Sequence, residues 1–314
     1  MELTLCDEPS GAPADYSRAL EERFTLVKRL GKNLIEDRYD GINGIVLLIT
    51  HGNEEKALKI TSAKTASQRE LHLACALHEL DAMIFSHVYG YLYGLPQSIP
   101  ATWRPYIGEL PQNFALGTNL IFTFSDYARY RFMDNDVRFT RKEFKSILYI
   151  LLHDLQEAFD RLGFTHGDIH DEQILLVPRP NTRDPIHVGT HTLTSRFVPK
   201  LIDYGESRAQ GTREQHEEDL SSLLLVMRYK LYALKSQGSV TPEDVQEFKD
   251  AERAGLTLTS PYFAELGSMG DENARVQARC IHCATPAAYY HENKRHLVCS
   301  QVCATIWSEK YSVF

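Results

Sequence analysis

The sequence has no long hydrophobic run and no excess of positive charge, and each of these two absences argues against a class of protein. The longest apolar stretches, such as residues 44–49 and 147–152, are far shorter than the roughly 20 residues of a membrane-spanning helix. The first residues are acidic and contain proline and glycine, unlike a secretory leader. We therefore expect an intracellular protein, cytoplasmic or nuclear, that is not secreted and has no membrane partner.

The charge balance argues against a nucleic-acid partner. The chain carries 34 Lys and Arg residues against 42 Asp and Glu residues, which gives a net charge of −8. A protein that holds a phosphate backbone is usually basic over a large surface. With 314 residues, of which 43% are hydrophobic, the chain can form a large two-lobed domain, or one domain with a small module.

Apolar patterning divides the first half of the chain into an arm, strands and a helix. Residues 1–21 read as a flexible N-terminal arm. Between residues 24 and 60, apolar runs separated by turn-forming residues predict three antiparallel strands. Residues 67–85 predict a helix, and residues 87–95 and 119–127 predict two further strands.

The second half is mainly helical. Residues 141–162 place apolar side chains at i, i+3 and i+4, the pattern of a long helix with one buried face. Strands are predicted at 173–177 and 197–203, with a hairpin insertion between them. Helices are predicted at about 214–236 and 241–254, and in the acidic run 214–219 only Asp219 is expected to be buried.

The stretch "FTHGDIHDEQILLVP", residues 164–178, is a polar loop followed by a short apolar strand. Loops held by a rigid scaffold often carry catalytic side chains, and Asp168 is the candidate here. His166 and His170 could bind a metal together with Asp168. The alternative, which we favour, is that these histidines hold the loop by hydrogen bonds.

This order of elements resembles the protein-kinase fold over about residues 22–260. Its motifs are most similar to those of the divergent branch, the haspin-like and atypical kinases and the aminoglycoside and choline phosphotransferases. Residues 166–173 stand where that branch carries His-Gly-Asp-x-x-x-x-Asn, Asp203-Tyr204-Gly205 stands where Asp-Phe-Gly is found, and Ala57-Leu58-Lys59-Ile60 resembles the Ala-x-Lys strand. The resemblance implies an α+β, bilobal fold with an antiparallel N-lobe (22–126) and a mainly helical C-lobe (127–262).

The same resemblance implies roles for particular residues in binding ATP and Mg²⁺. Lys59 would contact the nucleotide phosphates and pair with Glu70, or alternatively with Glu79. Asp168 would be the catalytic base. The remaining implied roles are Mg²⁺ ligation by Asp203 and Gln173, loop anchoring by Asp219, and covering of the nucleotide by Gly41, Gly44 and Val46.

Three departures from the family pattern bear on activity. Gln173 replaces the usual asparagine, so its amide oxygen extends further. The glycine loop keeps only Gly41-x-x-Gly44-x-Val46, and 13 residues between Gly205 and Asp219 leave no room for a long activation segment. We expect a phosphotransferase that moves the γ-phosphoryl of Mg-ATP to a hydroxyl, of a protein serine or threonine or of a small molecule. The alternative is a pseudokinase scaffold that binds nucleotide weakly or not at all and recruits a protein partner.

Four of the six cysteines lie near the end of the chain, as Cys280-x2-Cys283 and Cys299-x3-Cys303. Two such pairs suit one tetrahedral Zn²⁺ with four thiolate ligands, a structural site without an open position for water. One of His282, His291 and His296 could replace a cysteine, and four reduced thiols are the alternative to a metal site. Residues 276–314 resemble a treble-clef, MYND-like zinc finger, which implies a protein partner.

Overall fold

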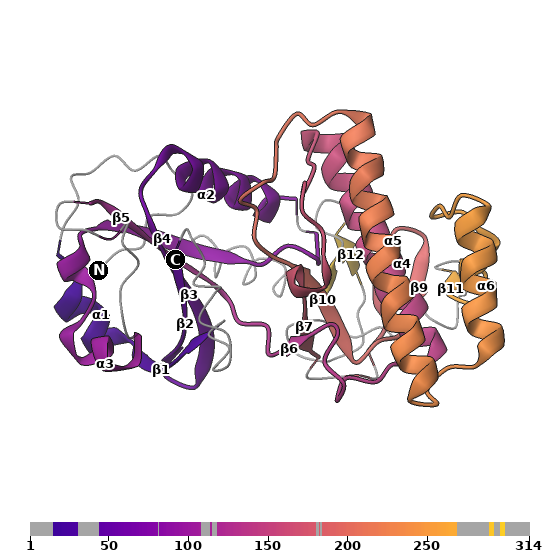
Figure 1. Cartoon of the computed structure of the whole chain (residues 1–314), viewed down its shortest axis with the longest axis horizontal. Helices are drawn as coiled ribbons and strands as arrows, with labels where there is room; N and C mark the ends of the chain where they lie inside the picture. The colour runs from indigo at the N-terminus through magenta and orange to yellow at the C-terminus, as the bar shows by residue number, and fades with distance from the viewer. Residues whose placement is uncertain are drawn as a thin grey trace. The chain divides into compact units, whose positions relative to one another are not determined.

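The computed structural model describes residues 15–30, 44–80, 82–107, 114, 118–179, 182 and 184–268, and the backbone of residues 289–291 and 296–298. These residues form two compact units (Figure 1). The first unit contains the described residues up to 79 and those of 86–127, and the second contains the described residues of 80–85 and those from 128 onward. The architecture is α+β with mainly antiparallel sheets, as the sequence predicts.

The first unit is built on a five-stranded antiparallel sheet in the order β1-β2-β3-β5-β4. Its strands are β1 (Thr25–Leu30), β2 (Gly44–His51), β3 (Glu54–Ser62), β4 (Val88–Gly94) and β5 (Leu120–Asp126). A tight turn at Gly52, where φ is 60°, joins β2 to β3, and glycine adopts this backbone conformation without strain. The predicted strands of this half are confirmed.

One face of this sheet is buried by short helices. These are α1 (Ser17–Arg23), η1 (Pro96–Ser98), η2 (Ala101–Trp103) and α3 (Arg104–Ile107). Leu20, Trp103 and Ile107 share one apolar cluster with the inward-facing residues of the sheet. The predicted arm is therefore wrong for residues 17–21, because Leu20 is fully buried and fixes α1 to the core. Residues 1–14 lie outside the described residues.

Helix α2 (Thr65–His78) lies against β4 (Figure 1). It ends earlier than the predicted helix at 67–85. The cause lies in the second unit, where the Asp154 carboxylate accepts hydrogen bonds from the backbone amides of Met83 and Ile84, at 2.6 and 3.2 Å. The Ile84 carbonyl also accepts a hydrogen bond from Leu201 N at 2.6 Å. These contacts hold residues 83–84 in a turn rather than in a helix.

The second unit is organised around α4 (Arg141–Leu162), whose ends match the prediction. At its start, Thr140 and Glu143 form a reciprocal capping box, in which each side chain accepts a hydrogen bond from the other's backbone amide. At its end, Gly163 has a φ of 64°, the left-handed conformation that terminates many helices. Both signals are local, and the buried face between them is continuous.

A three-stranded antiparallel sheet follows α4 in the order β10-β7-β6. The elements of this part are β6 (Tyr130–Arg131), η4 (Asp171–Gln173), β7 (Ile174–Pro178), β8 (Ile186–Val188), β9 (His191–Leu193), β10 (Phe197–Leu201) and β11 (Gly267–Ser268). β8 and β9 form a hairpin, which confirms the predicted insertion between β7 and β10. The β7–β10 pairing places the residues after β10 next to the loop that precedes β7.

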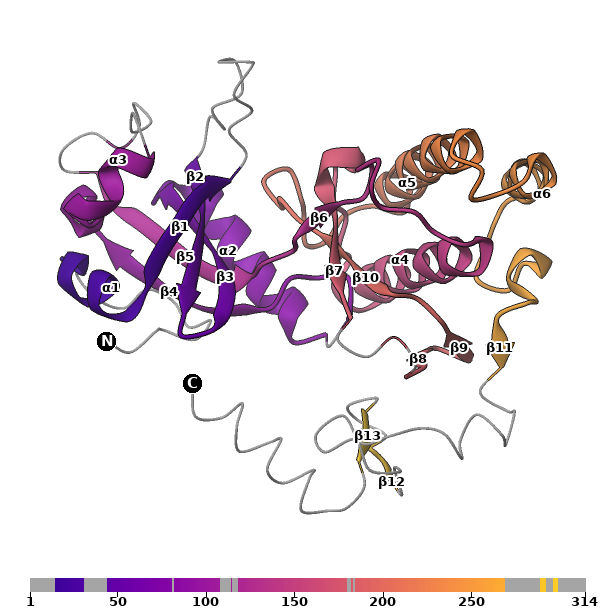
Figure 2. The same ribbon diagram turned by 90° about the horizontal axis from the view of Figure 1, so that it is seen from below.

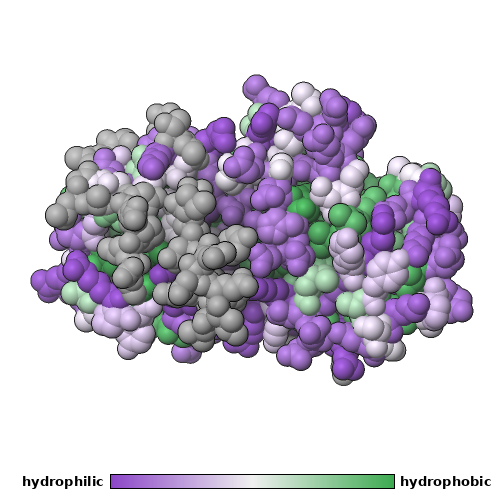
Figure 3. Space-filling view, in the orientation of Figure 1, coloured by the Kyte–Doolittle hydropathy of each residue, from purple (hydrophilic) through white to green (hydrophobic). Residues whose placement is uncertain are grey.

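Helices α5 (Arg213–Ser236) and α6 (Pro242–Arg253) confirm the two predicted helices, and η5 (Pro261–Phe263) follows them. α5 packs against both α4 and α6 (Figure 2). Figure 3 shows apolar side chains among hydrophilic ones in the region of these helices. Three large apolar side chains of α5 are at least 38% exposed: Leu225, Tyr229 and Tyr232.

The four cysteines of the predicted zinc site lie outside the described residues. Between the two pairs in the sequence, β12 (Tyr289–His291) and β13 (His296–Val298) form an antiparallel hairpin. Cys75 in α2 is disulfide-bonded, which the sequence does not predict. None of the helices in the described part of the chain is both long and apolar enough to cross a membrane.

Candidate functional site

In the first unit, the amine of Lys59 and the carboxylate of Glu70 form an ion pair. Lys59 lies on β3, between Val46 on β2 and Thr123 on β5, and Glu70 lies on α2. The side chains of Lys59 and Glu70 are only 29% and 17% exposed, so the pair is largely removed from water. The prediction that Glu70 pairs with Lys59 is confirmed.

The glycine at the start of β2 has a packing role of its own. A Cβ on Gly44 would lie 2.4 Å from the carbonyl oxygen of Ile60, closer than any side chain allows. Gly44 therefore lets β2 approach β3 next to Lys59. Val46 lies directly opposite Lys59 in the register, whereas Gly41 is outside the described residues.

In the second unit, one buried carboxylate holds the loop at residues 164–173 by hydrogen bonds to its backbone. Asp219 on α5 is 3% exposed and accepts hydrogen bonds from the backbone amides of His166 at 2.5 Å and Gly167 at 2.8 Å. A buried carboxylate is tolerated only when such donors satisfy it. The expectation that Asp219 is buried and anchors this loop is confirmed.

Gly167 carries the sharp turn of the loop. Its φ is 79°, and a Cβ there would lie 2.9 Å from the carbonyl oxygen of Glu206. A side chain would therefore meet both backbone strain and a steric clash. The turn directs the next residue, Asp168, to an exposed position, with 55% of its side chain accessible to solvent.

His166 is fully buried and links the loop to the end of β10. Its Nε2 lies 3.0 Å from the carbonyl oxygen of Ile202, and its Nδ1 accepts a hydrogen bond from the backbone amide of Asp168 at 3.3 Å. Burial lowers the pKa of His166, and this effect outweighs the hydrogen bond to Ile202 and the nearby carboxylates, which raise it. The ring is therefore neutral, protonated on Nε2, and it holds the loop as expected.

Asp203 follows Ile202 directly and has an unusual backbone conformation. Its φ is 65°, in the left-handed region, which costs a non-glycine residue roughly 1 kcal/mol or more. The neighbouring Tyr204 is buried and donates a hydrogen bond from its hydroxyl to the carbonyl oxygen of Leu201 at 2.7 Å. This turn presents the Asp203 carboxylate at an exposed position just beyond the strand.

His170 lies between Asp168 and Gln173. Its Nε2 is 3.6 Å from a carboxylate oxygen of Asp168 and 3.0 Å from the amide of Gln173. Because its Nδ1 accepts a hydrogen bond from the backbone amide of Glu172 at 3.3 Å, the neutral ring carries its proton on Nε2. The Gln173 atom at 3.0 Å is the amide nitrogen, so this proton is accepted by Gln173 only if the amide turns by 180° and places its oxygen there; the side chain is buried.

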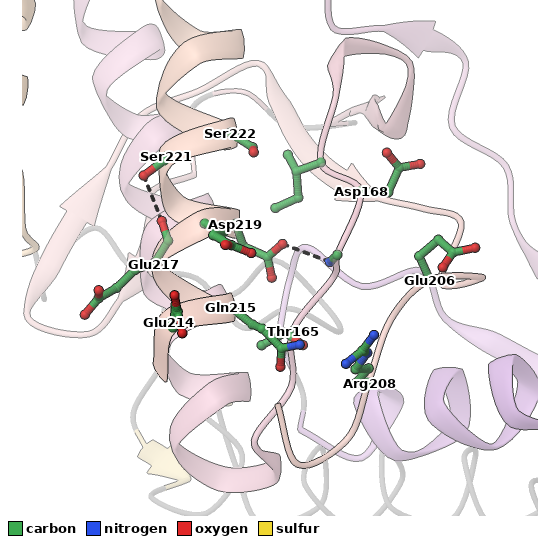
Figure 4. A pocket seen from close by; sticks show the side chains of 13 residues that line it. Thr165, Asp168, Glu206, Arg208, Glu214, Gln215, Glu217, Asp219, Ser221 and Ser222 are labelled. Carbon is green, nitrogen blue, oxygen red and sulfur yellow. Dashed lines mark hydrogen bonds between the residues drawn. The ribbon is translucent and has the colours of Figure 1, made fainter. Parts of the chain in front are cut away.

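A hollow of about 800 Å³ opens beside Asp168 (Figure 4). The loop contributes Thr165, Gly167 and Asp168, and the N-terminal turns of α5 form the opposite wall. Figure 4 shows the carboxylates of Asp168 and Glu206 on the loop side and that of Glu214 on the helix side, whereas the carboxylate of Glu217 points away from the loop. Its volume lies within the usual range of small-molecule and cofactor sites, about 300–1,000 Å³.

Sequence reasoning missed the segment that closes this hollow. Ser207 is fully buried and donates a hydrogen bond from its hydroxyl to the carbonyl oxygen of His166 at 2.9 Å. Thr165 and Arg208 exchange two backbone hydrogen bonds, at 3.0 and 2.9 Å. A lone serine after an Asp-Tyr-Gly turn carries no signal of this kind, because the contact depends on the tertiary fold.

The described side chains also contain one cluster that could hold a cation, His153, Asp154 and Glu157 on α4. Asp154 already accepts two backbone hydrogen bonds and contacts His153 at 2.9 Å, so its carboxylate has a structural role. No protein-family model matches the chain, and no curated protein matches its sequence.

Proposed function

We propose that the chain is a phosphotransferase with a protein-kinase-like fold that moves the γ-phosphoryl of Mg-ATP to a hydroxyl, of a protein serine or threonine. The observation that carries this proposal is the network Asp219–His166–Ile202. It fixes the loop of Asp168 to the strand end that leads into Asp203. Such placement of charged groups is the main requirement of phosphoryl transfer, since the protein contributes little covalent chemistry.

Asp168 is the proposed base. Its carboxylate is exposed beside the hollow, where it can accept the proton of the acceptor hydroxyl. The hydroxyl oxygen then forms a bond to the γ-phosphorus, while the bond between that phosphorus and the β–γ bridging oxygen breaks and leaves ADP. The His166–Asp168 backbone contact and the anchoring of Gly167 keep this carboxylate in place.

Lys59 is the proposed phosphate ligand. Its ammonium group is held on the face of β3 by Glu70, so the charge is positioned before a nucleotide arrives. A fixed cation of this kind stabilises phosphate oxygens without a cost of reorganisation. The proposal requires that Lys59 and the carboxylates of the second unit act on the same nucleotide.

The residues of the second unit fit a magnesium ion in part. Asp203 offers an exposed carboxylate, the ligand type that Mg²⁺ prefers, on a turn with a left-handed backbone conformation. Gln173 fits less well, because its amide is buried and hydrogen-bonded to His170. Magnesium, when bound with ATP, would neutralise charge on the phosphates, and Asp203 is the residue we expect to hold it.

The test is transfer of labelled phosphate from ATP to protein acceptors by the full-length chain. We expect Asp168→Asn to abolish transfer and Asp171→Asn to retain it. Asp171 is a matched control, because it lies in the same loop and the two side chains are almost equally exposed, 56% for Asp171 and 55% for Asp168. Equal rates for Asp168→Asn and the wild type would refute the proposed base.

The second candidate is a pseudokinase scaffold that binds nucleotide weakly or not at all and recruits a protein partner. Two observations favour it: the engaged amide of Gln173 and the packing role of Gly44. Nucleotide that binds the native state raises the melting temperature. A shift with Mg-ATP that is lost in Lys59→Met, without phosphate transfer under any condition, would identify a nucleotide-binding scaffold. No shift at all would identify a scaffold without nucleotide.

We also propose that Cys280, Cys283, Cys299 and Cys303 hold one structural Zn²⁺ in a finger that binds a protein partner. The support is their spacing, because two close pairs of thiolates match the tetrahedral preference of zinc. Metal analysis of the purified chain should give one zinc per molecule. Replacing Cys280 and Cys283 by serine should remove it, whereas Cys6→Ser should not.

A further inference from the structure

The hollow beside Asp168 is strongly acidic. Six carboxylates and one guanidinium line it. The carboxylates belong to Asp168, Glu206, Glu214, Glu217, Glu218 and Asp219, and the guanidinium belongs to Arg208. Asp219 is already satisfied by two backbone amides, and Figure 4 shows the Glu217 carboxylate pointing away from the loop, which leaves Asp168, Glu206, Glu214 and Glu218 as the other acidic lining residues.

Pairing within the protein neutralises little of this charge. Glu217 lies 3.7 Å from Arg213, but both side chains are more than 60% exposed, and such pairs contribute little. Among the described residues, no ion pair involves Glu206, Glu214 or Glu218. The electrostatic potential of the hollow is therefore available to a ligand.

The stability of α5 does not explain why the residues that line the hollow are acidic. Glu214 lies in the first turn of α5, where the helix dipole favours an acidic side chain. Glu217 and Glu218 lie beyond that turn, and Glu206 belongs to another segment. Glu214 and Glu218 are four residues apart on one helix, a spacing at which two like charges destabilise it. The repulsion between these carboxylates lowers the stability of the folded protein, and a bound cationic ligand would offset it.

We propose that this hollow binds the positively charged flank of the acceptor, so that the substrate is a hydroxyl whose neighbouring residues carry arginine or lysine side chains. This inference rests on the proposed function, because Asp168 lies in the wall of the same hollow. An arginine placed between Glu206 and the α5 carboxylates would bring an adjacent hydroxyl to the proposed base. Charge complementarity also steers such an acceptor to the site.

The test uses two fluorescein-labelled serine peptides, one with arginines flanking the serine and one with citrulline in their place. Citrulline has nearly the shape of arginine without its charge. Fluorescence anisotropy with the full-length protein, without nucleotide, measures binding alone. We expect the arginine peptide to bind at least roughly tenfold more tightly, with affinity falling as salt is raised.

Two variants decide whether the hollow is responsible. The double variant Glu214→Gln/Glu218→Gln should weaken binding of the arginine peptide roughly tenfold and leave that of the citrulline peptide unchanged. Glu243→Gln is the matched control, because Glu243 occupies the same position after the N-cap of α6 as Glu214 does in α5 and does not line the hollow. Melting curves should show the double variant folded, with Glu218→Gln at least as stable as the wild type.

The two proposals fail in different ways. Equal affinity for both peptides, no binding of the arginine peptide, or no effect of the double variant would overturn the acidic acceptor site. Selective binding of the arginine peptide without phosphate transfer to it would leave the site standing and count against the proposed function. Transfer to the citrulline peptide at an equal rate would support the function and overturn the charge selection.

Discussion

Nε2 of His166 lies 3.0 Å from the carbonyl oxygen of Ile202. The other nitrogen of the same ring accepts a hydrogen bond from the backbone amide of Asp168. One neutral imidazole thus connects the loop of Asp168 to the residue that precedes Asp203. A protonated ring could keep the first contact but would lose the second, because it has no acceptor nitrogen.

Acid should weaken this connection. Burial lowers the pKa of His166 in the folded state below its ordinary value of about 6.5. Between the two values the unfolded chain binds more protons, so the free energy of unfolding falls as the pH falls below about 6.5, by up to roughly 1.4 kcal/mol per pH unit for this group. His166→Gln retains a donor for Ile202 and does not titrate, and it should show a shallower pH dependence.

The measurement is urea unfolding at several values of pH from 5 to 7.5. His72→Gln is the control, because His72 is exposed on α2. We expect this control to follow the wild type throughout. A pH dependence in His166→Gln as steep as that of the wild type would contradict the assignment.

Removing the anchor of the loop should destabilise the second unit. Asp219→Asn retains one acceptor oxygen for the two amides of His166 and Gly167, so one buried donor loses its partner, at a cost of about 1–3 kcal/mol. Urea unfolding should register this loss. Hydrogen exchange should also show weaker protection of the His166 and Gly167 amides, whereas Glu217→Gln, at an exposed carboxylate on the same helix, should change neither quantity.

Lys230 should give a pH dependence of the same sign at the basic end. Its side chain is fully buried and donates hydrogen bonds to the carbonyl oxygens of Asp134 and Val137, at 3.1 and 2.9 Å. Burial lowers its pKa to about 8. Between pH 8 and the ordinary value near 10.5, the unfolded chain carries a proton that the folded chain has released. The free energy of unfolding should therefore rise with pH in this window, by about 2–3 kcal/mol.

The check is the difference in unfolding free energy between the wild type and Lys230→Met, followed from pH 7.5 to 10. This difference should move in favour of the wild type as the pH rises. Lys142→Met, at an exposed position of α4, should show no such trend. A flat difference for Lys230→Met would mean that the buried amine keeps its proton over this range.

Gly44→Ala separates packing from nucleotide binding in the first unit. A Cβ at this position would lie 2.4 Å from the carbonyl oxygen of Ile60, so β2 must move away from β3, at a cost of about 1–3 kcal/mol. We expect a lower melting temperature without nucleotide present. An unchanged melting temperature together with weaker binding of Mg-ATP would instead assign Gly44 to the nucleotide alone.

Local signals made much of the fold predictable. The capping box at Thr140 determines the start of α4, and Gly163 in the left-handed conformation determines its end. The sequence alone shows the residues of both signals. The end of α2 was not predictable, because it depends on Asp154, some 70 residues later in the chain. The pairing of Lys59 with Glu70 could be predicted only through the resemblance, since periodicity places Glu79 on the same helix.

The candidate site was predictable where one residue acts alone and not where segments meet. Asp168, Asp203 and Asp219 follow from their motifs. The contact of Gln173 with His170 does not, because it depends on how the short helix η4 turns before β7. The acidic hollow is formed where three segments meet, residues 165–169, residues 206–208 and the first turns of α5. The sequence shows each of them only as a polar stretch.

The segment that closes the hollow is tied to the loop at both ends, by Thr165 with Arg208 and by Gly211 N with the carbonyl oxygen of Gly163 at 2.6 Å. A Cβ on Gly211 would lie 2.4 Å from the side chain of Thr165, so the seam admits no bulk. Residues 208–211 are therefore held in one conformation by their contacts with residues 163–165, and any rearrangement of this stretch has to break these hydrogen bonds and this close packing first.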